Sequence, residues 1–342
     1  MIYLCKEVKI MNRKKVGVVC GGYSSEHNIS LQSGENVYSA LDRKKWEVFL
    51  IVLTEESWTA KDDSSNIYNV SKGDFSLQRL NTSIQLDLIF NLVHGSIGEN
   101  GQLAALWELL GIPHTSCDNY NASLTLNKRD CLTVLREWNV STAKYYTLDK
   151  GDKLDPDKII ACVGLPCFVK ANRGGSSFGI FKVFEENDLI KSIEKAFNED
   201  SQLIIESFLD GREFSVGTVE IDNNIIVLPI TEIITNNKFF DFSAKYEGQS
   251  EEITPAIISK KWEKKLDELS KKIYSKLGLK GIVRSDFIVI DGVPHILEIN
   301  SVPGMTAKSI IPKQVKAFGL DLSEFLTKIL LQIDHSQKVN SI

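Results

Sequence analysis

The alternation of strand and helix patterns in the first third of the chain constrains the fold most. Buried, strand-like runs at 15–22, 46–53 and 86–95 are separated by runs with helical spacing at 30–41 and 101–113. Repeated β-α-β units of this kind predict a parallel sheet, and such sheets bind ligands at the carboxyl ends of their strands. We therefore expect an N-terminal α/β domain whose functional residues follow its strands.

The pattern changes from about Asn127, where an α+β arrangement begins. We expect three parts, at residues 12–126, 127–214 and 215–338, with a long polar stretch at 236–255. The elements predicted in the last two parts are helices at 128–138, 187–198 and 260–278, strands at 166–172, 179–184, 202–209, 213–221 and 225–233, and a hairpin at 283–300.

Composition is typical of a soluble globular protein and limits the partners. The chain has 342 residues, enough for two or three domains, with 43% hydrophobic and 25% charged residues. A net charge of −5 gives no general electrostatic reason to bind nucleic acid or an anionic membrane. No apolar run approaches the roughly 18 residues of a membrane span, and the start shows no signal-peptide cleavage pattern. Six cysteines without a C-x-x-C pair indicate reduced thiols, so we expect a cytoplasmic protein.

The hairpin VRSDFIVIDGVPHILEIN carries polar residues that an ordinary hairpin would not place together. A three-residue loop at 291–293 puts Asp286 opposite Glu298 and Arg284 opposite Asn300, all on one face. Like charges directly across a ladder destabilise it. A solvated face of an edge hairpin is one explanation. The other is a Mg²⁺ site, because this cation prefers oxygen ligands and is usually completed by substrate phosphates.

A phosphate-binding loop would supply that partner, and the candidate is KANRGGSSFGIFKV between two strand-like runs. Gly174 and Gly175 allow exposed backbone N–H groups to cradle an anion, and Ser176 and Ser177 add hydroxyl donors. Lys170 enters the loop from an apolar strand. The segment is neither a P-loop nor a Rossmann fingerprint, so an ordinary glycine-serine turn stays open as the alternative.

A third candidate is the segment IIESFLDGREFSV. Glu206 and Glu213 flank an apolar link that could hold an adenine edge and ribose hydroxyls. A connector with ordinary surface charges is the alternative.

Six motifs in sequence order carry a resemblance to a known family: GGYSSEHNISLQSG, HGSIGENG, KANRGGSSFG, FFDFSAKY, RSDF and EINSVPGMTAKSIIP. From about residue 15 to 330 the chain resembles the D-alanine–D-alanine ligases of the ATP-grasp superfamily. The resemblance implies a Rossmann-like preATP-grasp domain with a parallel sheet, followed by an ATP-grasp fold of two subdomains.

In such ligases ATP phosphorylates the carboxylate of one D-alanine, and the amine of a second D-alanine attacks the acyl phosphate. ADP and phosphate leave, and the dipeptide serves peptidoglycan precursor synthesis. The resemblance implies ATP as co-substrate, two Mg²⁺ or Mn²⁺ ions, two molecules of D-alanine and a homodimer. The nearest rivals are an ATP-grasp carboxylate–amine ligase with another acceptor, and a nucleotide-sensing protein on a decayed ligase fold.

The resemblance also implies roles for residues of the ATP-grasp part. Asp286, Glu298 and Asn300 match the metal ligands, and Arg284 matches the arginine at the oxyanion of the tetrahedral intermediate, with the Gly304 N–H as second donor. The nucleotide site comprises Lys128, Lys170 and Lys245 at the phosphates, Ser176 in the glycine-serine loop, Glu206, Ser207 and Leu209 at the adenine hinge, and Glu213 at the ribose.

On the substrate side, Glu26 matches the residue that binds the first D-alanine ammonium, with Ser176 and Tyr246 as its partners. His94 follows a predicted strand, where ligand residues are expected, and Ser309 matches the group that binds the second carboxylate. Glu26 as an ordinary capping or surface residue and His94 as a buried structural histidine are the alternatives. Departures from the family pattern are Asn100, His114, Ser116 and Asn127.

The polar stretch 236–255 is expected to be a lid, because it is long and flanked by strands. It carries Lys245 and Tyr246. Family members that make D-alanine–D-lactate lack this tyrosine, so its presence predicts a dipeptide product.

Overall fold

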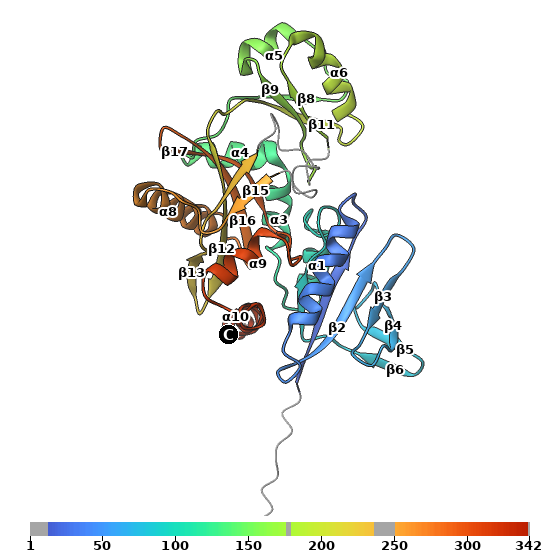
Figure 1. Ribbon diagram of the computed structural model, residues 1–342. Helices are drawn as coiled ribbons and strands as arrows, with labels where there is room; N and C mark the ends of the chain where they lie inside the picture. Colours follow the sequence, from blue (N-terminus) through green and yellow to red (C-terminus); the bar gives the residue numbers. More distant parts are fainter. Residues whose placement is uncertain (1–12, 176–178, 236–249, 341–342) are drawn as a thin grey trace, which may run out of the picture.

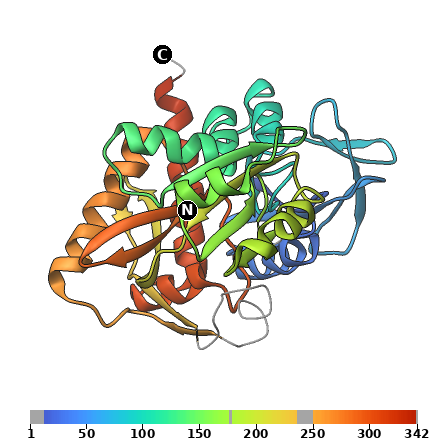
Figure 2. The ribbon, with the colours of Figure 1, turned by 90° about the horizontal axis from the view of Figure 1, so that it is seen from above.

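Three sheets form the framework of the molecule. The computed structural model describes residues 13–175, 179–235 and 250–340. Figure 1 shows a small four-stranded part at the top, a six-stranded part below it and a seven-stranded N-terminal part at the lower right. The view from above in Figure 2 places the blue N-terminal sheet and the orange helix of residues 260–277 on opposite sides of the molecule. The expected mixed α/β architecture is therefore confirmed.

The N-terminal sheet is parallel at its centre. β1 (Lys14–Gly21) pairs in parallel with β2 (Trp46–Leu53) on one side and with β7 (Leu88–Asn91) on the other. Helix α1 (His27–Ala40) connects β1 to β2, and α2 (Gln102–Leu109) follows β7. The carboxyl ends of β1 and β7 therefore lie at one edge, where the alternating pattern predicted functional residues.

Four short strands that the sequence pattern did not predict extend this sheet. They are β3 (Trp58–Lys61), β4 (Ile67–Val70), β5 (Leu77–Arg79) and β6 (Thr82–Ile84), each antiparallel to the next. Strands of three or four residues are too short to show a clear period. The sheet is consequently mixed, in the order β6-β5-β4-β3-β2-β1-β7.

The middle part is a four-stranded antiparallel sheet in the order β10-β9-β11-β8. Its strands are β8 (Tyr145–Asp149), β9 (Cys167–Ala171), β10 (Ile180–Val183) and β11 (Gln202–Ser207), with helices α5 (Pro156–Val163) and α6 (Glu186–Ala196). Helices α3 (Asn119–Leu126) and α4 (Lys128–Glu137) lead into it. β9 and β10 form the hairpin that carries the glycine-serine loop, so this loop lies at one end of the sheet.

The C-terminal part is a sheet in the order β15-β14-β12-β16-β17, with β13 paired to β12. Its strands are β12 (Arg212–Ile221), β13 (Asn224–Val227), β14 (Thr231–Thr235), β15 (Ser250–Ile253), β16 (Ile282–Ile290) and β17 (Val293–Asn300). The predicted strand at 225–233 is wrong as one element. It divides around Pro229 into β13 and β14, which pair with different stretches of β12.

The stretch predicted as a lid is partly a strand. β15 pairs antiparallel with β14, so residues 250–253 belong to the sheet. Lys245 and Tyr246 lie outside the described residues, as does Ser176 of the glycine-serine loop.

The polar hairpin has the predicted register but not the predicted loop. The turn is the two residues Asp291 and Gly292, whose φ values are 50° and 74°, the positive values that a tight Asp-Gly turn favours. A bulge on β17 leaves Leu297 between the pairs of Ile296 and Glu298. The turn is one residue shorter than the predicted loop, and the bulge adds one residue to β17, so the two differences cancel in the register. Asp286 therefore faces Glu298, as expected.

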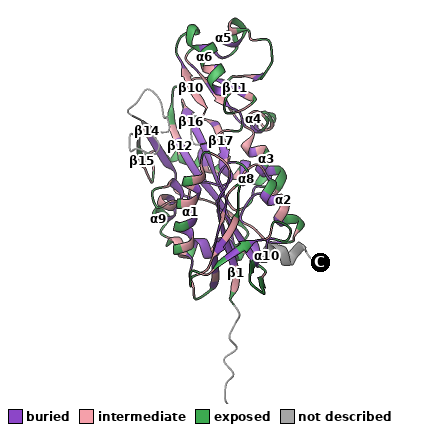
Figure 3. Cartoon of the chain, turned by 90° about the vertical axis from the view of Figure 1, so that its right-hand side faces the viewer, coloured by how far each residue is buried: buried purple, intermediate pink, exposed green. Residues whose placement is uncertain are grey.

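Three helices complete the C-terminal part: α8 (Lys260–Leu277), α9 (Ile310–Ala317) and α10 (Leu322–Asn340). Phe325, Leu326 and Ile329 of α10 share one buried cluster with Val16 and Val18 of β1, so the last helix packs on the N-terminal sheet. Figure 3 shows buried residues along the central strands and exposed residues on the outer helices. Within the described ranges, none of the helices has the length and apolar character needed to cross a membrane.

Candidate active site

Two cavities meet between the sheets. The larger has a volume of about 620 Å³ and lies between the middle and C-terminal sheets, where β9, β10, β12, β14 and β16 supply its walls. The smaller, of about 50 Å³, lies where the ends of β1 and β7 approach β16 and β17. Gly174, Gly175, Arg284 and Glu298 line both cavities. These four residues therefore lie where the two cavities meet.

The polar face of the β16–β17 hairpin is the floor at this junction. Arg284 donates from Nε and Nη2 to the two carboxylate oxygens of Asp286, at 2.9 and 2.8 Å. Asn300 Nδ2 and Ser215 Oγ donate to the same carboxylate at 3.1 and 2.6 Å. Arg284 and Asp286 are 8% and 6% exposed. A solvated edge face, the alternative considered for this hairpin, does not fit such burial.

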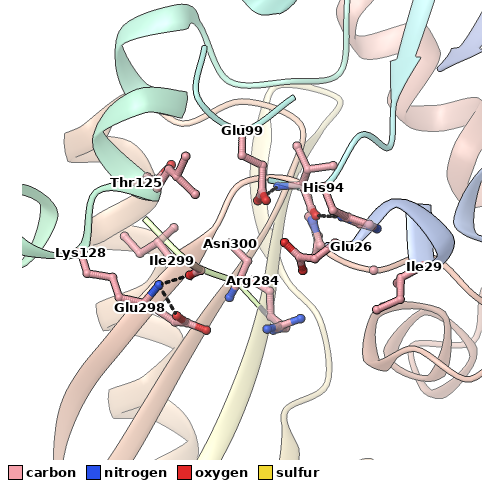
Figure 4. Close-up of a pocket in the computed structure, with 16 residues that line it drawn as sticks. Glu26, Ile29, His94, Glu99, Thr125, Lys128, Arg284, Glu298, Ile299 and Asn300 are labelled. Carbon is pink, nitrogen blue, oxygen red and sulfur yellow. Dashed lines mark hydrogen bonds and ion pairs between the residues drawn. The ribbon is translucent and has the colours of Figure 1, made fainter. Parts of the chain in front are cut away.

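Glu298 is held from the other side of the junction. Lys128, at the start of α4, lies with its Nζ 3.3 Å from Glu298 Oε2 and donates to the carbonyl oxygen of Gly174 at 2.6 Å. Figure 4 shows Lys128 and Glu298 together beside Asn300 and Arg284. One lysine thus contacts both the carboxylate of β17 and the backbone of the glycine-serine loop.

The larger cavity combines apolar walls with a buried ion pair. Lys170 Nζ lies 2.5 Å from Glu206 Oε2. Burial by itself would lower the pKa of Lys170, but the carboxylates of Glu206, Glu298 and Glu213 together outweigh it and raise that pKa above its usual value. Glu206 is 2% exposed, and its Oε1 has no hydrogen-bond partner among the described residues. A buried acceptor without a partner indicates space for a donor on a bound ligand.

Aromatic rings line the rest of this cavity. The rings of Phe168 and Phe208 lie 6.2 Å apart, and Lys182 Nζ lies 3.8 Å from the centroid of Phe208. Burial lowers the pKa of Lys182. Leu297, the residue at the bulge, also lines the wall. Apolar walls with a few polar groups are typical of a nucleotide or cofactor pocket.

Glu26 lies directly before α1, yet its side chain makes no capping hydrogen bond. It lines the smaller cavity and contacts the glycine-serine loop so closely that a Cβ added to Gly175 would lie 2.4 Å from Glu26 Oε2. Only glycine at position 175 therefore permits this approach. Glu99 lies nearby, and burial together with the charge of Glu26 raises the pKa of Glu99 to about 8.

Three further predicted residues lie at the smaller cavity or beside it. His94 is 4% exposed and its ring nitrogens face the Val302 carbonyl oxygen at 2.8 Å and Ser33 Oγ at 3.3 Å, which fits a buried structural histidine. Gly304 lines the cavity. Ser309 Oγ accepts from the N–H of Thr306 at 3.1 Å, and a Cβ on Gly304 would lie 2.9 Å from it.

The structure brings most of the predicted site residues to the two cavities. Those that line them are Glu26, His94, Lys128, Lys170, Glu206, Ser207, Leu209, Glu213, Arg284, Asp286, Glu298, Asn300 and Gly304. Ser215 and Lys182 were missed. Ser215 lies two residues after Glu213 on β12, and Lys182 two residues after Ile180 on β10, so the period of a strand could have indicated both.

Two sheets that enclose a cavity with lysines and carboxylates, together with an N-terminal sheet that is parallel at its centre, indicate the class: an ATP-grasp ligase. Models of the D-ala D-ala ligase N-terminus and C-terminus match residues 15–117 and 134–331. The chain therefore belongs to the D-alanine–D-alanine ligase family, as its motifs predicted, and is a ligase.

Similar proteins and similar solved structures match nearly the whole length of this chain. A D-alanine–D-alanine ligase of Flavobacterium johnsoniae is 47% identical over 93% of this chain and 98% of its own length. The structure of VanG D-Ala:D-Ser ligase from Enterococcus faecalis has a TM-score of 0.84 at 32% identity, covering 94% of this chain and 99% of that one. A D-alanine–D-alanine ligase from Bacillus anthracis complexed with ATP has a TM-score of 0.76 at 26% identity, covering 95% and 99%.

Proposed function

We propose that the protein joins two molecules of D-alanine at the junction of its two cavities, with ATP bound in the larger and D-alanine in the smaller. The carboxylate of the first D-alanine takes the γ-phosphoryl group and ADP is released. The amine of the second then attacks the carbonyl carbon, a C–N bond forms, and phosphate leaves. The observation that supports this most strongly is that Gly174, Gly175, Arg284 and Glu298 line both cavities.

The larger cavity fits ATP by charge and by shape. Lys128 and Lys170 would neutralise the phosphates, with Lys245 as a third cation. The partnerless Oε1 of Glu206 would accept from the adenine amino group, with Ser207 and Leu209 along the same hinge, and Glu213 would accept from the ribose. The phenylalanine rings would supply apolar contact to the base. Ser176 would add a donor from the glycine-serine loop.

The hairpin fits a divalent cation by the chemistry of its donors. Asp286, Glu298 and Asn300 offer two carboxylates and an amide oxygen, the ligand types that Mg²⁺ and Mn²⁺ accept. These residues would hold the two expected ions, which when bound supply positive charge to the phosphates and remove the repulsion between the carboxylates. Without ions, Lys128 and Arg284 already offset the repulsion between the two carboxylates, because Lys128 contacts Glu298 and Arg284 contacts Asp286.

The smaller cavity would bind the amino acids through their charges. Glu26 would accept from the ammonium of the first D-alanine, with Ser176 and Tyr246 as its partners. Arg284 and the Gly304 N–H would donate to the oxygen that becomes negative in the tetrahedral intermediate. One such donor contributes about 10²–10³ in rate. Ser309, whose Oγ would lie 2.9 Å from a Cβ added to Gly304, would bind the second carboxylate.

The acceptor needs a direct test, because the similar VanG structure is that of a D-Ala:D-Ser ligase. Purified enzyme, ATP and Mg²⁺ would be given equal concentrations of D-alanine, D-serine and D-lactate, and the products separated by mass. We expect D-alanyl-D-alanine as the main product and negligible depsipeptide. If a mixed dipeptide or a depsipeptide dominated, the preferred acceptor would be D-serine or D-lactate and not D-alanine.

Two further proposals concern assembly and location. We expect a homodimer, which sedimentation at several concentrations would test, and a cytoplasmic location, which cell fractionation would test. A concentration-independent monomer or a membrane fraction would contradict them.

A further inference from the structure

The segment between β17 and α9 is held at Val302 by two side chains of the N-terminal part. The Val302 N–H donates to Glu99 Oε1 at 3.2 Å. The Val302 carbonyl oxygen lies 2.8 Å from His94 Nδ1. The backbone N–H and the carbonyl oxygen of Val302 are therefore both bound by residues that follow β7 and lie about 200 positions earlier in the chain.

The same segment is held at Met305 by helix α1. The Met305 N–H donates to Ser33 Oγ at 3.2 Å, and its carbonyl oxygen accepts from Asn36 Nδ2 at 2.7 Å. Ser33 and Asn36 are three residues apart, so one face of α1 presents both side chains. We call the four side chains Ser33, Asn36, His94 and Glu99 the backbone clamp.

The hydrogen bonds of the clamp have one consistent direction. A carbonyl oxygen can only accept, so His94 Nδ1 carries the hydrogen that meets Val302. In the neutral ring Nε2 then accepts, and Ser33 Oγ lies 3.3 Å away as its donor. The hydroxyl oxygen of Ser33 in turn accepts from the Met305 N–H. In this tautomer His94 joins Val302 to Ser33 and so to Met305, and these four residues are buried.

Gly304 lies between the two clamped residues and, like Val302 and Pro303, lines the smaller cavity. Pro303 before it has no N–H and a restricted φ. No described residue accepts a hydrogen bond from the Gly304 N–H, whereas the N–H groups of Val302 and Met305 are both used. Clamping the neighbours therefore restricts the direction of the single N–H that stays available to a ligand.

We propose that the backbone clamp is a set of positioning residues that holds the Gly304 N–H toward the tetrahedral intermediate. This inference rests on the proposed function, in which that N–H is an oxyanion donor. The clamp touches no reacting atom. It couples helix α1 and the end of β7 to the acyl-transfer step, so the N-terminal part serves the chemistry beyond its binding of D-alanine.

A loosened clamp should lower kcat and leave the KM for ATP unchanged. The oxyanion exists only during the reaction, so losing its donor removes an interaction made only in the transition state. Simple loss of packing between the parts would instead lower the melting temperature and change all constants together. These two outcomes separate positioning from a structural role.

Asn36 offers the cleanest test because it is only half-buried on α1. Asn36→Asp keeps the size and removes the donor to Met305, and Asn36→Gln restores a donor on a longer side chain. We expect Asn36→Asp to lower kcat about tenfold, to weaken a phosphinate mimic of the tetrahedral intermediate by a similar factor, and to keep the KM for ATP within twofold. Asn36→Gln should recover part of both losses. Gln32→Ala, exposed on the same helix, is the control and should match the wild type.

The second half of the clamp provides an independent measurement. Glu99→Gln retains one acceptor and loses the other, and we expect a fall in kcat of about tenfold. Combined with Asn36→Asp, the loss should be smaller than the product of the two, because both changes release the same segment. Unchanged kcat in Asn36→Asp, or an equal loss in kcat and in the affinity for ATP, would overturn the clamp. Absence of dipeptide from the wild-type enzyme would instead overturn the proposed function.

Discussion

The two cavities differ in how they can hold a ligand. The larger, of about 620 Å³, has phenylalanine and isoleucine walls and two buried ion pairs, Lys170–Glu206 and Arg284–Asp286, whereas the smaller, of about 50 Å³, is ringed by charged and polar groups. Apolar area and a few directed polar groups suit a nucleotide. Charges suit a small amino acid, which offers little apolar surface. Substitutions in the two cavities should therefore change different kinetic constants, and substitutions at their junction should change the chemical step itself.

The largest effect is expected at the junction. Glu298→Gln removes the charge of a proposed metal ligand that lines both cavities, so we expect kcat to fall about 10²–10³-fold. This is the scale of losing a principal electrostatic contact in the transition state. Folding should persist, because a neutral amide can still accept from Lys128 and the repulsion with Asp286 disappears. Steady-state kinetics and a melting curve check both statements, with Glu324→Gln on the exposed face of α10 as control. Near-normal turnover would exclude the hairpin as the metal site.

The next effect concerns the smaller cavity alone. Glu26→Gln replaces the proposed charged partner of the substrate ammonium, and hydrogen bonds to charged groups contribute about 1.5–3 kcal/mol. We expect the KM for D-alanine to rise roughly 10- to 100-fold and the KM for ATP to stay near its wild-type value. Glu35→Gln, on the exposed side of α1, should change neither constant. A rise in the KM for ATP alone would show that the smaller cavity binds ATP and not D-alanine.

A smaller effect is expected in the larger cavity. Glu206→Gln replaces the carboxylate expected to accept from the adenine amino group, so the KM for ATP should rise about tenfold. Inosine triphosphate lacks that amino group and offers the direct comparison. The wild type should prefer ATP, and Glu206→Gln should lose most of the preference. Equal discrimination in both proteins would show that Glu206 does not contact the base.

The smallest effect lies outside both cavities. Burial lowers the pKa of His114 from 6.5 to about 4, and its Nδ1 has no hydrogen-bond partner among the described residues. Between pH 4 and pH 6.5, His114 is therefore protonated in the unfolded chain and neutral in the folded chain. The free energy of unfolding should fall as the pH drops from about 6.5 to 4, by about 1 kcal/mol per pH unit.

His114→Phe should flatten that decline, and His295→Gln should not. Denaturant titrations at several pH values measure the slope. Neither substitution should alter the KM for ATP or for D-alanine, because His114 lines neither cavity. A wild-type slope in His114→Phe would assign the pH dependence to other groups.

The sequence predicted the residues that share a local pattern better than those joined across the chain. The register of Asp286 with Glu298 followed from an Asp-Gly turn and the two-residue period of strands, although the prediction reached it through a wrong loop. The bulge at Leu297 has no sequence signal, since apolar residues on both sides read as uninterrupted strand. The bulge nonetheless shapes the larger cavity, where we propose that ATP binds, because Leu297 lines its wall.

Contacts between distant segments were beyond local reasoning. Asn36 and Met305 are 269 residues apart, and nothing in the helical pattern of α1 marks Asn36 as different from its exposed neighbours. The position of His94 at the end of a predicted strand suggested a substrate residue, whereas its ring contacts Ser33 and the Val302 backbone. Packing of α10 on β1 was missed for the same reason: the segments meet only in three dimensions.

The central claim is that a carboxylate in the smaller cavity attacks phosphate held in the larger one across Arg284 and Glu298. D-Alanine labelled with ¹⁸O in its carboxylate tests it directly. If an acyl phosphate forms at the junction and is then cleaved by an amine, one labelled oxygen must leave with the phosphate. Mass analysis of the released phosphate should therefore show one ¹⁸O for each dipeptide formed. Dipeptide accompanied by unlabelled phosphate would contradict the transfer between the two cavities.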